Sequence, residues 1–173
     1  MARFPEYRLG RQLALQFLYS LEFSELGWRA ALPEFWNLDP VGLSLEYGAD
    51  DDTCETPEPP DERQIAEARV FAEKLIEGVC SHRAELERLI TSAFDNWKPE
   101  RVGRIEWVIL RMALYEMHHC PESPKVVVIS EANRLATLFG DVEAPRFISG
   151  VLNRLLDAGK ETGDDDSAQE VTS

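Results

Sequence analysis

The chain has 173 residues, of which 44% are hydrophobic, and a formal net charge of −14 at pH 7. Its length predicts one domain with a sizeable core, and no apolar run reaches the ~18–20 residues that a membrane span needs. The N-terminal residues lack the apolar segment of a secretory signal, and three scattered cysteines are typical of a reducing compartment, so we expect a cytoplasmic protein.

The first third of the chain predicts two helices and a loop. Apolar residues at helical spacing indicate a helix from about Pro5 to Glu25 and a shorter helix from Trp28 to Leu38. Residues 39–60 contain three consecutive aspartates and several prolines, a composition that cannot readily offset the entropy of ordering. We therefore expect an acidic surface loop over residues 39–60, partly disordered.

Three more helices are predicted in the middle of the chain. Asp61 and Gln64 form the pattern of a capping box, and the helix that they begin breaks near Ser81. Apolar spacing then predicts two helices that Pro99 separates, one over residues 86–97 and one over residues 100–119.

Two helices follow after residue 122. Ser123 is expected to cap the first of them, with Pro124 at its first position. Gly140 is expected to end this helix in a left-handed conformation. A turn over residues 140–145 leads to the last amphipathic helix, and an acidic tail is predicted from Gly159 onward. The whole chain is therefore predicted to be all-α, with about seven helices.

The negative charge lies in two segments. Residues 31–62 hold ten acidic residues and no Lys or Arg, and residues 160–173 hold five acidic residues and one Lys. The rest of the chain is neutral, and its basic residues can still cluster. A neutral body predicts weak nonspecific affinity for nucleic acid, because phosphate neutralisation supplies most of that affinity. The acidic segments are interpreted as solubilising or, alternatively, as repelling nonspecific RNA.

The last two predicted helices carry a specific combination of residues. A Glu-Ala pair at residues 131–132 and a Phe-Gly turn at residues 139–140 precede a Phe-x-x-Gly-Val-Leu-Asn run at residues 147–153. Two upstream segments accompany them: Arg-Met-Ala-Leu-Tyr-Glu at residues 111–116 and Arg-Gln-Leu-Ala-Leu-Gln-Phe-Leu-Tyr-Ser at residues 11–20.

These separated blocks, in this order, resemble the NusB family of bacterial transcription antitermination factors. The resemblance covers about residues 8–24 and 63–158. It implies an all-α, NusB-like bundle of two packed helical sub-bundles. The expected organisation is one domain over residues 1–159, with residues 39–60 as a loop insertion, followed by a disordered tail over residues 160–173.

The first predicted helix carries candidates for RNA binding. Helical spacing places Arg8, Arg11, Gln16 and Tyr19 on roughly one face. Arginine can contact phosphates, glutamine can read a base edge, and tyrosine can stack on a base. Packing between helices is the alternative for Tyr19. In NusB proteins an arginine-rich N-terminal segment helps to bind a short single-stranded RNA element called boxA, so the resemblance implies this partner.

The turn after residue 139 carries a second set of candidates. Glu143 can accept a hydrogen bond from an amino group of a base, Arg146 can contact a phosphate, and Phe147 can stack. Alternatively, Asp141 and Glu143 only cap the last helix. The resemblance implies that this turn lies near the RNA, with Glu143 at a position where an acidic residue is typical.

A third candidate surface would bind protein. Arg104, Glu106 and Trp107 are predicted on the exposed side of the helix over residues 100–119, and an exposed tryptophan suits an interface anchor. The resemblance implies NusE, a small-subunit ribosomal protein, as the partner, with Glu106 at that interface. The alternatives are that Trp107 belongs to the core and that Glu106 is a solvated charge.

The sequence shows no pattern of catalysis or of cofactor binding. It has no Gly-rich phosphate loop, no zinc-type spacing of Cys and His, and no sign of a Ser-His-Asp arrangement. The side chains of His118, His119 and Cys120 point in different directions from a helix end, which favours a polar terminus over a metal site. We therefore expect no enzyme, no metal and no cofactor.

The predicted function is that of a transcription antitermination adaptor. It would bind boxA-type RNA together with NusE in the RNA polymerase elongation complex and support ribosomal RNA transcription. An alternative is a NusB-fold interaction or regulatory module with weak or no RNA binding. The fold also occurs as a domain of some ribosomal RNA methyltransferases, but this chain lacks a Gly-rich cofactor loop. A possible homodimer, as in some NusB proteins, is left open.

Overall fold

The computed structural model describes residues 5–42, 59–94 and 98–161. These residues form α-helices and one 3-10 helix, η1, and no strand occurs among them, which confirms the predicted all-α class. In chain order the elements are α1 (Pro5–Leu21), α2 (Trp28–Asn37), α4 (Glu62–Ser81), α5 (Arg83–Ser92), η1 (Pro99–Arg101), α6 (Arg104–His119), α7 (Lys125–Phe139) and α8 (Ala144–Glu161).

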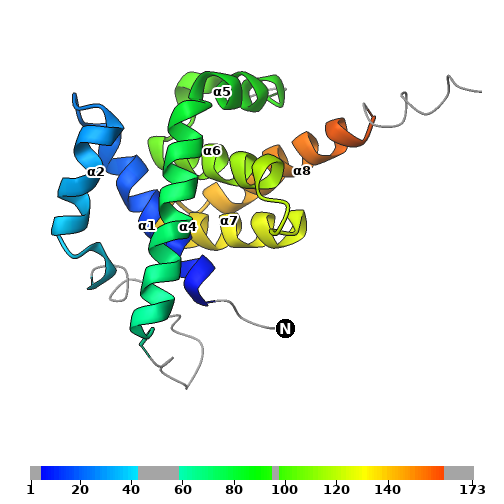
Figure 1. Ribbon diagram of the computed structural model, residues 1–173. Helices are drawn as coiled ribbons and strands as arrows, with labels where there is room; N and C mark the ends of the chain where they lie inside the picture. The colour runs from blue at the N-terminus through cyan, green and yellow to red at the C-terminus, as the bar shows by residue number, and fades with distance from the viewer. Residues whose placement is uncertain (1–4, 43–58, 95–97, 162–173) are drawn as a thin grey trace, which may run out of the picture.

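Two sub-bundles meet at α6 (Figure 1). In the first, the long α4 crosses α1, and α2 packs beside α1; in the second, α7 packs against α8 and α6. α6 also contacts α1, α4 and α5, so it joins the two groups of helices. Buried apolar residues come from every α-helix of this arrangement except α2, and the largest of them include Leu13, Leu75, Leu86, Leu114 and Ile148. Each such side chain contributes about 1.5–3 kcal/mol relative to an exposed one.

The two predicted helix caps had different outcomes. Asp61 Oδ1 accepts a hydrogen bond from the Gln64 amide at 2.7 Å, and Gln64 Oε1 accepts one from the Asp61 amide at 2.9 Å, which confirms the capping box. The prediction that Ser123 caps α7 is wrong. Pro124 is the N-cap residue, with an extended backbone, and no side chain caps the helix. Ser123 therefore lies one residue too far from the first turn.

Gly140 ends α7 as predicted, but not for the predicted reason. Its φ of −92° and ψ of −175° are extended rather than left-handed. A Cβ at this position would lie 2.6 Å from the Cβ of Ala144 and 2.7 Å from the carbonyl oxygen of Ala136. Glycine is needed here because α7 and the start of α8 approach closely.

Other helix ends differ from the predicted ones. α1 ends at Leu21, and the chain turns there through an amide-to-carbonyl bond from Glu22 to Tyr19. α6 begins at Arg104, later than predicted, because η1 and an extended Gly103 occupy the preceding positions.

Most of the predicted acidic loop and tail lies outside the described residues. Residues 40–42 are helical, and α8 continues to Glu161, beyond Gly159. The loop insertion and the tail therefore stay predictions. Within residues 5–42, 59–94 and 98–161, no helix is long and apolar enough to cross a membrane.

Candidate functional site

Arg11 is buried between α1 and α6. The residue is 6% exposed, and its Nε donates to Oε2 of Glu116 at 2.9 Å while Nη2 donates to Oε1. Its guanidinium also lies 5.4 Å from the ring centre of Phe71 on α4. The structure therefore contradicts the expected exposure of Arg11, because α6 covers this side of α1 and supplies the carboxylate that pairs with it. A role of Arg11 in RNA binding stays a prediction.

The other three candidates on α1 reach the surface to different extents. Arg8 donates from Nε and Nη2 to the two carboxylate oxygens of Glu131 on α7, at 3.2 and 2.7 Å, and stays partly exposed. Gln16 is half-buried, and Tyr19 is 39% exposed. Tyr19 is thus not enclosed between helices.

An exposed cluster of two aromatic rings and a guanidinium lies where the end of α1 meets the start of α6. We call Tyr19, Phe23 and Arg104 the α1–α6 edge. The rings of Tyr19 and Phe23 pack edge to face, with centres 5.2 Å apart, and the Arg104 guanidinium lies 4.6 Å from the centre of the Phe23 ring. Phe23 is 60% exposed. The sequence reasoning missed Phe23, although its position outside the apolar spacing of α1 was a signal.

The two neighbours of Arg104 in the predicted protein-binding set are not exposed. Glu106 is 8% exposed, and its carboxylate lies beside Gly103 and Gly140. The structure therefore contradicts the expected exposure of Glu106, and its place at an interface with a partner stays a prediction. A carboxylate in the first turn of α6 also suits the helix dipole. Trp107 is half-buried, and its Nε1 donates to the carbonyl oxygen of Pro99 at 3.4 Å.

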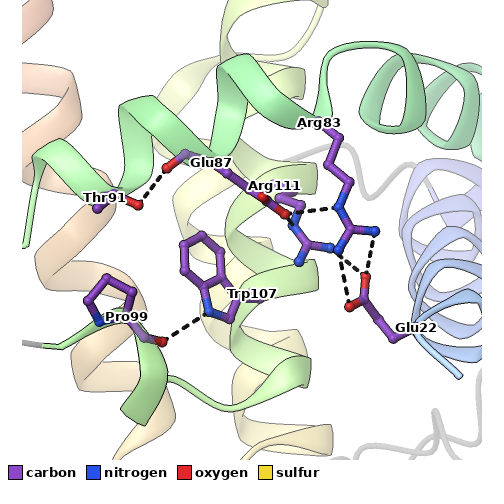
Figure 2. A network of polar contacts seen from close by, with 7 residues as sticks. All are labelled: Glu22, Arg83, Glu87, Thr91, Pro99, Trp107 and Arg111. Carbon is purple, nitrogen blue, oxygen red and sulfur yellow. Dashed lines mark hydrogen bonds and ion pairs between the residues drawn. The ribbon is translucent and has the colours of Figure 1, made fainter.

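Charged side chains join the end of α1 to α5 and α6 (Figure 2). Glu22 accepts hydrogen bonds from Nη1 of Arg111 at 2.7 Å and from Nη2 of Arg83 at 3.3 Å. Glu87 pairs with Nε of Arg83 at 2.9 Å and with Nε of Arg111 at 3.0 Å. The Arg111 guanidinium also lies 5.6 Å from the centre of the Trp107 ring. This network holds the segment next to the α1–α6 edge in place.

The network predicts an acid-sensitive contribution to stability. Burial raises the pKa of the Glu22 carboxyl, but the hydrogen bond and charge of Arg111, with those of Arg83, outweigh burial and hold the pKa below its ordinary value. Because the pKa is lower in the folded state, this stabilisation is present above the unfolded pKa and is lost as the pH falls through the folded pKa. We expect Glu22→Gln to cost about 1 kcal/mol at neutral pH.

Urea unfolding of both proteins across a pH series measures this contribution. The difference between wild type and Glu22→Gln should be constant near neutral pH and should decrease in acid, as the pH falls below the unfolded pKa of the carboxyl and on through its lower folded pKa. A difference that stays the same throughout the series would contradict the assignment.

The turn before α8 is built around Asp141. Its Oδ1 accepts hydrogen bonds from the amides of Glu143 at 3.0 Å and Ala144 at 2.9 Å, so Asp141 caps the helix. The side chains of Glu143 and Arg146 are exposed, and neither has a hydrogen bond or ion pair within the described part of the chain. Phe147 is half-buried, and its ring centre lies 5.7 Å from that of Phe94.

A pocket opens between the end of α5 and α8. Its volume is about 420 Å³, and Glu143, Arg146 and Phe147 line it together with residues that sequence reasoning did not assign to a site: Ala93, Phe94, Gly150, Val151 and Arg154. The structure thus brings the three candidates of the turn together around one concavity. The candidates on α1 and on α6 do not line it.

The described residues contain no group of three or more His, Cys, Asp or Glu side chains that could hold a metal ion. His119 instead stacks on Tyr115, with ring centres 4.6 Å apart, and lies 4.9 Å from the ring centre of His82.

The structure defines the class as an all-helical bundle without a strand in its described residues, and sequence comparison identifies the family. The pattern of the NusB family matches residues 8–157, and the chain belongs to this family. The transcription antitermination protein NusB of Geobacter sulfurreducens is 38% identical over 148 residues, which are 86% of this chain and 91% of that protein. The NusB protein of Myxococcus xanthus is 34% identical, over 86% of this chain and 92% of its own.

A solved structure of T. maritima NusB has the same fold. It aligns with a TM-score of 0.65 at 23% identity and covers 91% of this chain and 96% of its own. This structure confirms the predicted fold, and the match to the family pattern confirms the predicted resemblance to the NusB family.

Proposed function

We propose that the protein is a transcription antitermination adaptor of the cytoplasm, without a catalytic step or a cofactor. It binds boxA-type single-stranded RNA together with NusE in the RNA polymerase elongation complex and supports ribosomal RNA transcription. The observation that carries the proposal is the membership of the NusB family, with relatives named for transcription antitermination. The exposed side chains described above suit these partners.

The RNA-binding surface centres on the turn before α8. Arg146 offers a guanidinium for phosphate, Phe147 offers a ring for stacking, and Glu143 offers a carboxylate that can accept a hydrogen bond from an amino group. Arg8 and Gln16 extend the surface along α1 as far as Tyr19, where it borders the α1–α6 edge. Since Arg11 is paired inside the fold and the chain outside its two acidic segments is neutral, we expect weak binding of RNA by this protein alone.

The protein-binding surface is the α1–α6 edge. Exposed aromatic and arginine side chains are the types that most often anchor protein interfaces, and Phe23 and Arg104 are already stacked on each other. Trp107 is half-buried, so we expect it to pack beneath this surface rather than to contact the partner. We expect NusE to bind here and to add cations to a composite RNA surface, so that RNA binding tightens in its presence.

The experiment is fluorescence anisotropy with a boxA-type strand and a scrambled strand, with and without NusE, over a salt series. We expect selective binding that tightens with NusE. In Arg146→Ala, affinity should fall several-fold and the salt slope should decrease by about 1, because one phosphate contact is lost. Arg63→Ala removes the same charge from an exposed ion pair on α4, and it should leave the affinity for RNA and the salt slope unchanged.

The alternative function is an interaction module with weak or no RNA binding. The net charge of −14 and the burial of Arg11 are the observations that favour it. NusE binding without selective RNA binding would support this alternative and contradict the RNA-binding proposal. If neither NusE nor RNA binds, both proposals are wrong.

A further inference from the structure

We propose that the groove between α2 and α4 binds an acidic segment of a protein partner through Arg29, Arg69 and Trp36. Two tryptophans, two arginines, a leucine, a proline and a glutamate line this groove, and its volume is about 310 Å³. It shares no residue with the pocket between α5 and α8 or with the α1–α6 edge, so the inference goes beyond the proposed function. α2 lies at the edge of the bundle, on the side away from α8 (Figure 1).

The apolar face of α2 is covered only in part by the rest of the fold. α2 has no buried residue, whereas each of the other α-helices has at least one. Its large apolar side chains Trp28, Leu32 and Trp36 recur every four residues and therefore share one face. All three are half-buried and line the groove. A half-covered aromatic face of this kind is typical of a surface that meets a partner.

Each of the two tryptophan rings carries an arginine. The guanidinium of Arg29 lies 4.3 Å from the centre of the Trp28 ring, and that of Arg69 lies 4.6 Å from the centre of the Trp36 ring. The Arg29 side chain has no ion pair or hydrogen bond in the described part of the chain, although the protein has 32 acidic residues. Arg69 donates from Nε to Oε1 of Glu73 at 3.0 Å, which leaves its two terminal nitrogens for another acceptor. Stacking on a ring holds each guanidinium ready for a carboxylate.

Trp36 adds a third donor. Its Nε1 is buried and has no hydrogen-bond partner among the described residues. A buried donor without an acceptor costs free energy, and a ligand that brings an acceptor recovers this loss. Because the ring is half-buried on a helix without buried residues, it can turn its N–H toward the groove. The one carboxylate that lines the groove, that of Glu73, is already paired with Arg69, so the groove suits a ligand that is rich in acceptors.

A short acidic peptide matches these donors better than RNA does. Two guanidiniums suit two carboxylates, each of which can accept two hydrogen bonds from one arginine, and an apolar side chain between them would contact Leu32 and Pro33. A nucleic acid strand gains its affinity from many phosphate contacts. Residues 31–62, which include most of α2, hold ten acidic residues and no Lys or Arg, so they offer no further cations to a long anion.

Selection from a phage-displayed library of short random peptides tests the chemistry without a known partner. The wild type should enrich peptides in which two carboxylates flank an apolar residue, and Arg29→Ala/Arg69→Ala should not. Fluorescence anisotropy with the most enriched peptide then gives affinities. We expect Arg29→Ala to weaken binding roughly tenfold, because hydrogen bonds between two charged groups are lost. Arg63→Ala removes an arginine from an exposed pair with Glu67 on α4, outside the groove, and should bind the peptide as the wild type does.

Trp36→Phe separates binding from a structural role of the tryptophan. The variant keeps an aromatic ring on α2 and removes the N–H that has no partner. We expect its affinity for the peptide to fall several-fold while its melting temperature stays at or near that of the wild type. A fall in melting temperature with unchanged affinity would show that the indole serves the fold alone.

Three other results would overturn the inference. The first is a selection that enriches no acidic peptide, or enriched peptides that bind Arg29→Ala/Arg69→Ala as tightly as the wild type. The second is displacement of the peptide by a scrambled RNA strand, which would make the groove a nucleic-acid surface. The third is a loss of NusE binding in the double variant, which would make the groove part of that interface. If the wild type does not distinguish the boxA-type strand from the scrambled strand, the proposed function fails and this inference stands.

Discussion

Replacing Glu116 by alanine is expected to lower the free energy of unfolding by about 3–5 kcal/mol. Glu116 and Arg11 are both almost completely buried, and the guanidinium of Arg11 donates to both carboxylate oxygens. Without Glu116, the charge of Arg11 would stay enclosed between α1 and α6 with neither water nor a partner. Urea unfolding followed by circular dichroism at neutral pH measures the change.

Two further variants separate the buried charge from lost packing. Arg11→Met/Glu116→Leu removes both charges and keeps apolar volume, so we expect it to cost much less than Glu116→Ala alone. Glu122→Ala removes a carboxylate from an exposed pair with Lys74 and should change the free energy by less than about 1 kcal/mol. If Glu116→Ala costs no more than Glu122→Ala, the pair does not hold α1 against α6 in the way that we describe.

The second large effect is expected at Gly78, where alanine should destabilise the protein by about 1–3 kcal/mol. Gly78 is buried in α4, and a Cβ there would overlap the ring of Tyr115 on α6. The ring must move, or α4 and α6 must separate, and either change disturbs the contact between the two sub-bundles. Thermal unfolding followed by circular dichroism gives the shift in melting temperature.

Gly150→Ala is the matched control for this prediction. It is the same substitution inside a helix, but at a position where no atom lies within 4 Å of the new Cβ. We expect it to stabilise the protein by up to about 1 kcal/mol, because alanine is the better helix former. If Gly78→Ala and Gly150→Ala both stabilise the protein, the Tyr115 ring moves aside without a loss of stability, and the prediction for Gly78 is wrong.

The arginines of this chain differ in whether they pair with carboxylates of the fold. Arg11 and Arg111 are buried in ion pairs that join helices, and Arg8 is paired with Glu131 at the surface. Arg146 has no such pair in the described part of the chain. The three paired arginines are held by carboxylates of the fold, so they offer less charge to phosphate, which agrees with the proposed need for NusE.

Local sequence patterns were sufficient to predict the helices and to indicate the family. The 3.6-residue spacing of apolar residues predicted the helices, although α5 spans Arg83–Ser92 rather than residues 86–97, and the capping box of Asp61 and Gln64 predicted the start of α4. These features depend on residues within one or two turns of each other, so a single segment contains the information. The separated blocks near α1, α6, α7 and α8 were also enough to indicate the NusB family.

Only the tertiary structure decided which candidate side chains are exposed. Helical spacing predicts on which side of α1 Arg11 lies. It does not predict that α6 packs against that side, or that Glu116 of α6, 105 residues later, pairs with Arg11. Glu106 was misplaced for the same reason, since α6 lies between the two sub-bundles and has little free surface. The pocket beside Gly150 is likewise formed by two helices that are distant in sequence. The burial of a residue depends on which other elements pack against it. The apolar pattern of one segment does not reveal which segments those are.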